Sequence, residues 1–102
     1  MIIVRTVFQA NFGQGGALAK AMAESIAQMM PARRAPQKWR ILTDLSGPFD
    51  TVVLEVEAES LAAHEQARAE LFASPEFQAS MGRTASMMTG GRNEFYTLEA
   101  QG

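Results

Sequence analysis

The stretch KWRILTDLSGPFDTVVLEVE, residues 38–57, decides the fold, because it contains two strands and the turn that joins them. Apolar and polar side chains alternate on either side of the turn, and this period of two is typical of β-strands. Between the two alternating runs stands Gly47-Pro48, a pair that breaks regular structure, and Asp50 is suited to close the turn. The segment therefore predicts a β-hairpin.

The alternation also predicts which residues pair across the hairpin, since a slip by one residue would exchange its two faces. One register gives a continuous apolar face, built from the pairs Trp39–Val56, Ile41–Leu54 and Thr43–Val52. On the other face the same register gives the pairs Lys38–Glu57, Arg40–Glu55, Leu42–Val53 and Asp44–Thr51. Opposite charges directly across two strands stabilise a sheet by roughly 0.2–1 kcal/mol per pair, which favours this register further. The second face thus mixes charges with aliphatic side chains.

The N-terminal part of the chain predicts a strand and a helix. Residues 2–10 alternate like the hairpin strands. The loop FGQGG, residues 12–16, follows, and its glycine amides could hold a phosphate or simply connect the two elements. From Ala17 apolar residues recur with a helical period. We expect this helix to end near a basic turn that Pro31 and Pro36 bracket.

The C-terminal half predicts a helix in two pieces and a last strand. Ser60 is a candidate N-cap for the first piece. Ser74 followed by Pro75 is a second start signal, because serine caps helices and proline fits the first helical position. The inner side of the second piece is predicted to carry Phe77, Met81, Thr84 and Met88. We expect Gly90-Gly91 to end this helix and residues 92–99 to form the last strand.

The predicted order of elements is strand, helix, strand, strand, broken helix, strand. With right-handed crossovers this order predicts an α+β fold of the ferredoxin-like type, a four-stranded antiparallel sheet with helices on one face. The uncovered face carries the mixed set Arg5, Val7, Arg40, Leu42, Val53 and Glu55. Exposed apolar surface rimmed by polar groups marks interaction sites, so we expect two copies to pack sheet against sheet as a homodimer.

Length and composition limit the class of protein. The chain has 102 residues, the usual size of one domain, and we expect residues 1–102 to form a single domain. It has no cysteine, which excludes disulfides and thiolate zinc sites. Nine basic residues against eleven acidic ones give a net charge of −2, which argues against nucleic acid as a partner. The opening MIIVRTV is too short and too soon charged for a signal peptide or membrane span, so we expect a cytoplasmic protein without a membrane partner.

Four stretches together resemble one superfamily: FGQGG, LTDLSGPFDTVVLEVEAESL through the hairpin, SPEFQ at the helix break, and GRNEFYTLE at the end. They resemble the dimeric α/β-barrel superfamily, and within it most closely the NIPSNAP-like and stress-responsive barrel proteins. The resemblance covers nearly the whole chain and implies a ferredoxin-like protomer, a homodimer and a cavity between sheet and helices. The superfamily includes cofactor-free monooxygenases, haem-degrading and haem-dependent enzymes, isomerases and members without known activity. The resemblance therefore implies a fold rather than one function.

The candidate catalytic residues are His64, Asp44 and Glu55. His64 is the only histidine, and a histidine can act as a general base near neutral pH or as the axial ligand of a haem. A carboxylate in a partly apolar cavity could abstract a proton. The structural interpretation is a solvated His64 and a Glu55 that only pairs with Arg40. We expect no cofactor and no metal site, because one histidine without cysteine leaves a metal site poor in ligands.

The candidate ligand-binding residues are Arg5, Arg40, Asp44, Met81, Met88 and Tyr96. Arginine binds anionic groups, methionine adapts to irregular apolar surfaces, and tyrosine offers a polar tip. These residues favour a small, largely apolar ligand, held by a cofactor-free monooxygenase or isomerase or by a protein that only binds. The alternative is a non-catalytic, stress-related or regulatory dimer whose own side chains fill the cavity. The sequence leaves open whether the turn of residues 45–50 is a lid.

Overall fold

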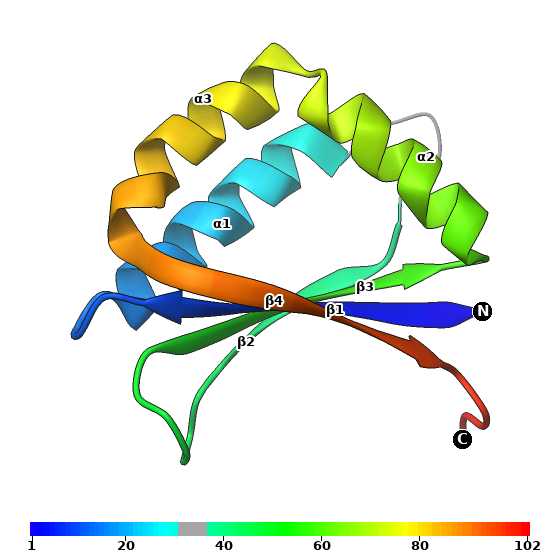
Figure 1. Ribbon diagram of the computed structural model, residues 1–102, viewed down its shortest axis with the longest axis horizontal. Helices are drawn as coiled ribbons and strands as arrows, with labels where there is room; N and C mark the ends of the chain where they lie inside the picture. Colours follow the sequence, from blue (N-terminus) through cyan, green and yellow to red (C-terminus); the bar gives the residue numbers. More distant parts are fainter. Residues whose placement is uncertain (31–36) are drawn as a thin grey trace.

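The sheet of this protein has four antiparallel strands in the order β2-β3-β1-β4, and the helices lie on one side of it (Figure 1). The computed structural model describes residues 1–30 and 37–102, so the predicted basic turn lies outside the described residues. The strands are β1 (Ile2–Ala10), β2 (Trp39–Thr43), β3 (Thr51–Ala58) and β4 (Met88–Thr97). The helices are α1 (Gly15–Met29), α2 (Leu61–Phe72) and α3 (Pro75–Thr84), followed by the short 3-10 helix η2 (Ala85–Met87). The predicted ferredoxin-like α+β fold is confirmed.

The predicted hairpin register and helix caps are confirmed as well. The observed hairpin pairs are Trp39–Val56, Arg40–Glu55, Ile41–Leu54, Leu42–Val53 and Thr43–Val52. The side chains of Ser60 and Ser74 accept hydrogen bonds from the backbone amides of Ala63 and Phe77 and thereby begin α2 and α3. Because side chains alternate along every strand, the register divides the sheet into a helix-facing side and an open face.

The core lies between α1 and the helix-facing side of the sheet. Leu18 of α1 and Val52 of β3 are 0% exposed, and Met22 packs in the same buried cluster. Leu18, Met22 and Ser25 recur at intervals of four and three residues, which turns one side of α1 toward its neighbours. The polar member of this series, Ser25, accepts a hydrogen bond of 2.8 Å from the buried hydroxyl of Ser80 on α3. The contact between α1 and α3 is therefore partly polar.

The end of α3 differs from the prediction. The helix ends at Thr84, and Gly90 and Gly91 lie inside β4 instead of stopping the helix. Gly91 pairs with Phe8, and a Cβ atom on Gly91 would lie 2.9 Å from the carbonyl oxygen of Val7. Glycine is needed there because the two strands approach closely. In a sequence, a glycine pair can therefore indicate a close strand contact as well as the end of a helix.

The predicted inner side of α3 is right for Thr84 and wrong for Met81 and Met88. Ser80 and Thr84 are the buried residues of this helix, whereas Met81 is exposed. Met88 does not belong to the helix at all, since it is the first residue of β4 and packs against the core cluster. The buried residues of α3 are thus small and polar, and a pattern of apolar residues does not indicate such a face.

The turn between β2 and β3 is tied to the start of α1. The carboxylate of Asp50 accepts hydrogen bonds from the backbone amides of Gly13 and Gly15, at 2.8 and 2.9 Å. Asp50 has a φ of 61°, in the left-handed region that aspartate tolerates. The amides at this helix start already hold an anion from the protein itself, so the loop serves as a connection. The turn extends away from the helices and does not cover the helix-facing side of the sheet (Figure 1).

Candidate functional site

Three rows of side chains cross the open face in the strand order β2-β3-β1-β4, and the third row begins with Lys38, the residue directly before β2. The first row, which we call the charge row, consists of Arg40, Glu55, Arg5 and Glu94. The second row is Leu42, Val53, Val7 and Arg92. The third is Lys38, Glu57, Ile3 and Tyr96, with the Glu57 amide donating to the Lys38 carbonyl at 3.0 Å. The charge row alternates in sign from one edge of the sheet to the other.

Glu55 holds both arginines of the charge row. Nη2 of Arg40 lies 2.7 Å from Oε1 of Glu55, and Nε of Arg5 lies 3.6 Å from Oε2. The hydrogen bond to Glu55 raises the pKa of Arg40. A general base needs an oxygen within reach of the proton that it removes, whereas both oxygens of Glu55 face cations. The geometry supports the structural interpretation of Glu55.

At the other end of the charge row, Glu94 bonds to two neighbours on its own strand. The hydroxyl of Tyr96 donates to Oε1 of Glu94 at 2.9 Å, and Nε of Arg92 lies 2.9 Å from Oε2. The bond from Tyr96, followed by that from Arg92, lowers the pKa of Glu94, and the same bond raises the pKa of Tyr96. Tyr96 was among the residues predicted from the sequence but Glu94 was not, because no short turn fixes the pairing of the last strand with the first.

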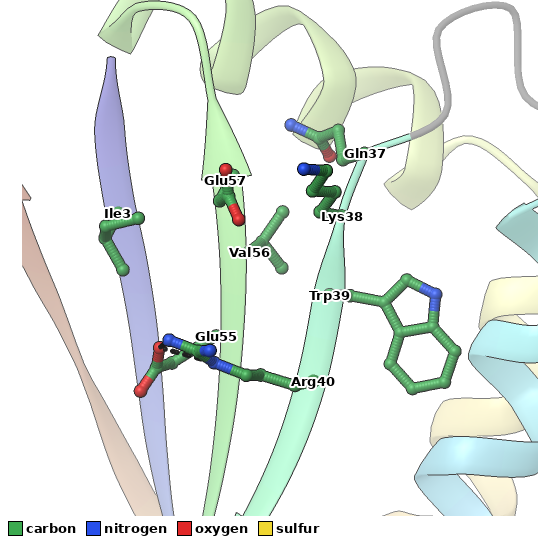
Figure 2. Close-up of a pocket in the computed structure, with 8 residues that line it drawn as sticks. All are labelled: Ile3, Gln37, Lys38, Trp39, Arg40, Glu55, Val56 and Glu57. Atoms are coloured by element: carbon green, nitrogen blue, oxygen red, sulfur yellow. Dashed lines mark hydrogen bonds and ion pairs between the residues drawn. The ribbon is translucent and has the colours of Figure 1, made fainter. Parts of the chain in front are cut away.

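A groove of about 430 Å³ lies at the end of the sheet where β2 begins, and residues of β2, β3 and β1 line it (Figure 2). Its lining includes the charged residues Lys38, Arg40, Glu55 and Glu57. In Figure 2, Arg40 reaches across to Glu55, while Trp39 points to the other side of the sheet, toward α1. A lining with two charges of each sign fits a polar protein surface better than a largely apolar small molecule.

The helix-facing side has a different exposed region, next to β4. The ring of Phe95 faces α2, where the ring of His64 lies edge-on with 5.8 Å between centroids, yet Phe95 is 51% exposed. Two residues earlier on the same side of β4, Oδ1 of Asn93 accepts a hydrogen bond of 2.8 Å from the hydroxyl of Thr6. We call Thr6, His64, Asn93 and Phe95 the helix-side site. It combines an aromatic surface, an uncharged polar pair and one titratable side chain.

The predicted site residues do not gather in one pocket. Oδ1 of Asp44 accepts a hydrogen bond of 3.0 Å from the Thr51 amide, so Asp44 closes the hairpin. Met81 lies exposed on α3 and Met88 lies against the core, whereas Arg5, Arg40 and Tyr96 share the open face. Of the helix-side site, only His64 was predicted from the sequence. Helix-facing polar residues on β4 become visible only once β1 and β4 are paired.

Among residues 1–30 and 37–102, no group of three or more histidine, cysteine, aspartate or glutamate side chains could hold a metal ion. Within the same ranges, no helix has the length and apolar character needed to cross a membrane.

Solved structures share this fold. An uncharacterized NIPSNAP domain protein from Burkholderia xenovorans superposes with a TM-score of 0.85 at 18% identity, over 98% of this chain and 96% of that chain. A NIPSNAP family protein from Agrobacterium tumefaciens gives a TM-score of 0.80 at 16% identity, over 94% and 90%. An antibiotic biosynthesis monooxygenase gives 0.69 at 14% identity, over 98% and 100%. No protein-family model and no curated protein matches the sequence. The chain has the ferredoxin-like fold of the NIPSNAP domain proteins, as the sequence resemblance predicted.

Proposed function

We propose that this protein is a homodimer that binds a small, largely apolar molecule at the helix-side site, between β4 and α2. The observation that carries the proposal is the position of Phe95, a residue that is 51% exposed although its ring faces the helices. The helices of the chain leave this aromatic surface half exposed. Covering it with a ligand would stabilise a complex by roughly 25 cal/mol for each Å² of apolar surface removed from water.

The other groups at the helix-side site define the class of ligand. None of the four described residues that define this site carries a carboxylate or guanidinium group, so they suit a neutral molecule. The hydroxyl of Thr6 donates to the side-chain oxygen Oδ1 of Asn93. The side-chain nitrogen Nδ2 of Asn93 is therefore the group that would donate to a ligand oxygen. A few placed polar groups beside an aromatic wall are typical of small-molecule sites. An aromatic or polyketide-like compound with a carbonyl or hydroxyl group fits this chemistry.

Turnover would require a base next to the bound molecule. One protein with this fold is named an antibiotic biosynthesis monooxygenase, and cofactor-free oxidation or isomerisation of such compounds begins with the loss of a proton from the substrate. His64 is the side chain of the helix-side site that would accept this proton. In an enzyme, His64→Ala abolishes turnover and keeps binding, whereas in a protein that only binds neither form turns the molecule over.

Native mass spectrometry of the protein purified from its own host tests the proposal. We expect a dimer that carries an additional small-molecule mass, and a loss of this mass in Phe95→Ala and Asn93→Ala. Phe12→Ala is the matched control, because Phe12 is an exposed phenylalanine in the loop after β1. An empty dimer would favour the alternative of a non-catalytic dimer with a filled cavity. A bound mass that Phe95→Ala leaves unchanged would contradict the helix-side site.

A further inference from the structure

Helix α2 carries a stripe of four exposed side chains along one side. The stripe consists of Leu61, Glu65, Arg68 and Phe72, which follow one another at intervals of four, three and four residues. Leu61 is 51% exposed and Phe72 is 47% exposed, with the two exposed charges between them. This spacing is that of the d and a positions of a heptad, which face a partner helix in a coiled coil. We infer that α2 pairs with α2 of a second copy of this chain, in antiparallel orientation about a twofold axis.

No residue of α2 is buried by the rest of the chain. The structure describes all 12 residues of this helix, and each of them is at least partly exposed, whereas α1 and α3 both carry buried residues. A helix of this length is marginal by itself, because most of the stability of a helix in a protein comes from packing one of its sides. In Figure 1, α2 lies at one end of the helix layer. A second helix packed on the stripe would therefore stabilise α2.

The order of side chains along the stripe determines the register. A twofold axis that is perpendicular to α2 and passes through the middle of the stripe places the stripe opposite its own reverse. Leu61 then lies opposite the partner's Phe72, and Glu65 lies opposite the partner's Arg68. A twofold axis parallel to the helices would place each charge opposite its own copy, and like charges in contact are unfavourable. The stripe is thus self-complementary in the antiparallel orientation, and its two charges favour this register over an apolar seam that could slip.

Two side chains of the stripe are held in place before a partner binds. The ring of Phe72 stacks on the ring of Phe77 from α3, with 5.0 Å between centroids and 29° between the ring planes. The guanidinium carbon of Arg68 lies 4.8 Å from the centroid of the Phe72 ring. Side chains that are ordered in the free protein lose less conformational entropy on association. The stack therefore favours the contact and keeps Arg68 along the stripe, toward the partner's Glu65.

The α2 contact is additional to the homodimer expected through the open face, and it is independent of the proposed ligand. Helix α2 and the open face lie on opposite sides of the sheet, so both contacts can form at once (Figure 1). A homodimer has two α2 helices, and their pairing would join dimers into tetramers and larger even-numbered assemblies. Since three helical turns bury less area than a standard interface, we expect these assemblies to depend on concentration. The contact would also fix the helix that carries His64, a member of the helix-side site.

Exchange of the two charges tests the register. Sedimentation velocity over a series of concentrations would give the dissociation constant of the α2 contact for the wild type, Glu65→Arg, Arg68→Glu and the double variant. We expect each single variant to weaken the contact by about tenfold or more. The double variant should restore most of this loss, because it forms both pairs again with the signs exchanged. Glu70→Arg, at an exposed position on the other side of α2, is the matched control and should change nothing, and circular dichroism checks that every variant keeps its helices.

Disulfide formation provides a second readout of the orientation. The chain has no cysteine, so Glu65→Cys and Arg68→Cys each introduce a single thiol. A disulfide forms only between positions that face each other closely, so a mixture of the two variants should give mainly the covalent dimer that joins position 65 to position 68. A parallel pair would join each position to its own copy, and mass spectrometry distinguishes the three products. Gln66→Cys, exposed on α2 outside the stripe, is the control and should give little covalent dimer.

The outcomes separate the α2 contact from the proposed homodimer and its ligand. A wild type that forms no species larger than the dimer, together with an absence of the mixed disulfide, would overturn the α2 contact while the homodimer stands. Larger assemblies that the charge exchange leaves unchanged, or disulfides between identical positions, would overturn the antiparallel register. A wild type that stays monomeric at every concentration would overturn both contacts, and the retained ligand mass would still decide the helix-side site.

Discussion

The two faces of the sheet bury side chains in different ways. On the helix-facing side, α1 covers large residues completely, and Leu18 and Val52 are 0% exposed. On the open face, Val7 and Val53 are only 8% exposed although no helix covers them, because they lie on the two central strands between longer side chains. Leu42, on the edge strand β2, remains 38% exposed. The open face is thus buried at its centre and exposed at its edges.

The largest difference in the free energy of unfolding between the two faces is expected for one leucine on each face. Leu18→Ala should lower the free energy of unfolding by about 2–5 kcal/mol, since it leaves a cavity under α1. Leu42→Ala removes the same atoms from the open face and should cost less than about 1 kcal/mol in the monomer. Urea unfolding at low protein concentration measures both. Equal losses would show that the two faces do not differ in this way.

A smaller effect is expected for the polar contact between α1 and α3. Ser25→Ala leaves the buried hydroxyl of Ser80 without its 2.8 Å partner and should cost about 1–3 kcal/mol. The double variant Ser25→Ala/Ser80→Ala removes both hydroxyls and should be more stable than Ser25→Ala alone. Ser86→Ala, at an exposed position, is the control. Losses that simply add would mean that the two serines do not act as a pair.

The next effect concerns Asp50, at the end of the sheet where the hairpin meets the helix layer. Asp50→Ala removes the acceptor of the Gly13 and Gly15 amides and should lower the free energy of unfolding by about 0.5–2 kcal/mol. Asp50→Asn keeps one side-chain oxygen and tolerates the observed φ of 61°, so it should lose less. Thermal unfolding of the two variants gives the comparison. A larger loss for asparagine than for alanine would contradict the role of Asp50 as a helix cap.

Local signals determined how much could be predicted from sequence. The hairpin could be predicted residue by residue because its turn and its alternation lie within residues 38–57. Ser60 and Ser74 are equally local signals, and both helix starts are confirmed. The start of β4 was predicted wrongly because Gly90-Gly91 fits a helix end as well as a close strand pair, and only pairing with distant β1 decides between them.

The same limit applies to the candidate site. Arg40 and Glu55 could be placed together because they belong to one hairpin. Glu94 completes the charge row, and Asn93 completes the helix-side site, through the pairing of β4 with β1, which no turn encodes. Sequence reasoning therefore found three of the four residues of the charge row, Arg5, Arg40 and Glu55, but only His64 of the helix-side site.

The smallest effect expected is a pH dependence confined to the open face. The bonds from Tyr96 and Arg92 lower the pKa of Glu94 below 4.5, so its contribution to stability is present above pH 4.5 and is lost as the pH falls through the lower pKa of the folded protein. Glu94→Gln should therefore destabilise the protein near neutral pH, and the difference from the wild type should shrink in acid. The effect is small, because exposed charges are screened by water.

The contribution of Tyr96 to stability depends on pH in the opposite direction. Its hydrogen bond to Glu94 raises its pKa above 10.0, so this contribution is present below pH 10.0 and is lost as the pH rises through the raised value. Urea unfolding of wild type and Glu94→Gln near neutral pH, in acid and in strong base should give the largest difference at neutral pH. Glu99→Gln, in the exposed C-terminal tail, is the control. Leu18 on the helix-facing side carries no titratable group, so the cost of Leu18→Ala should stay constant over the same acid range. If the difference in stability between the wild type and Glu94→Gln stayed equally constant, Glu94 would not be bonded as described.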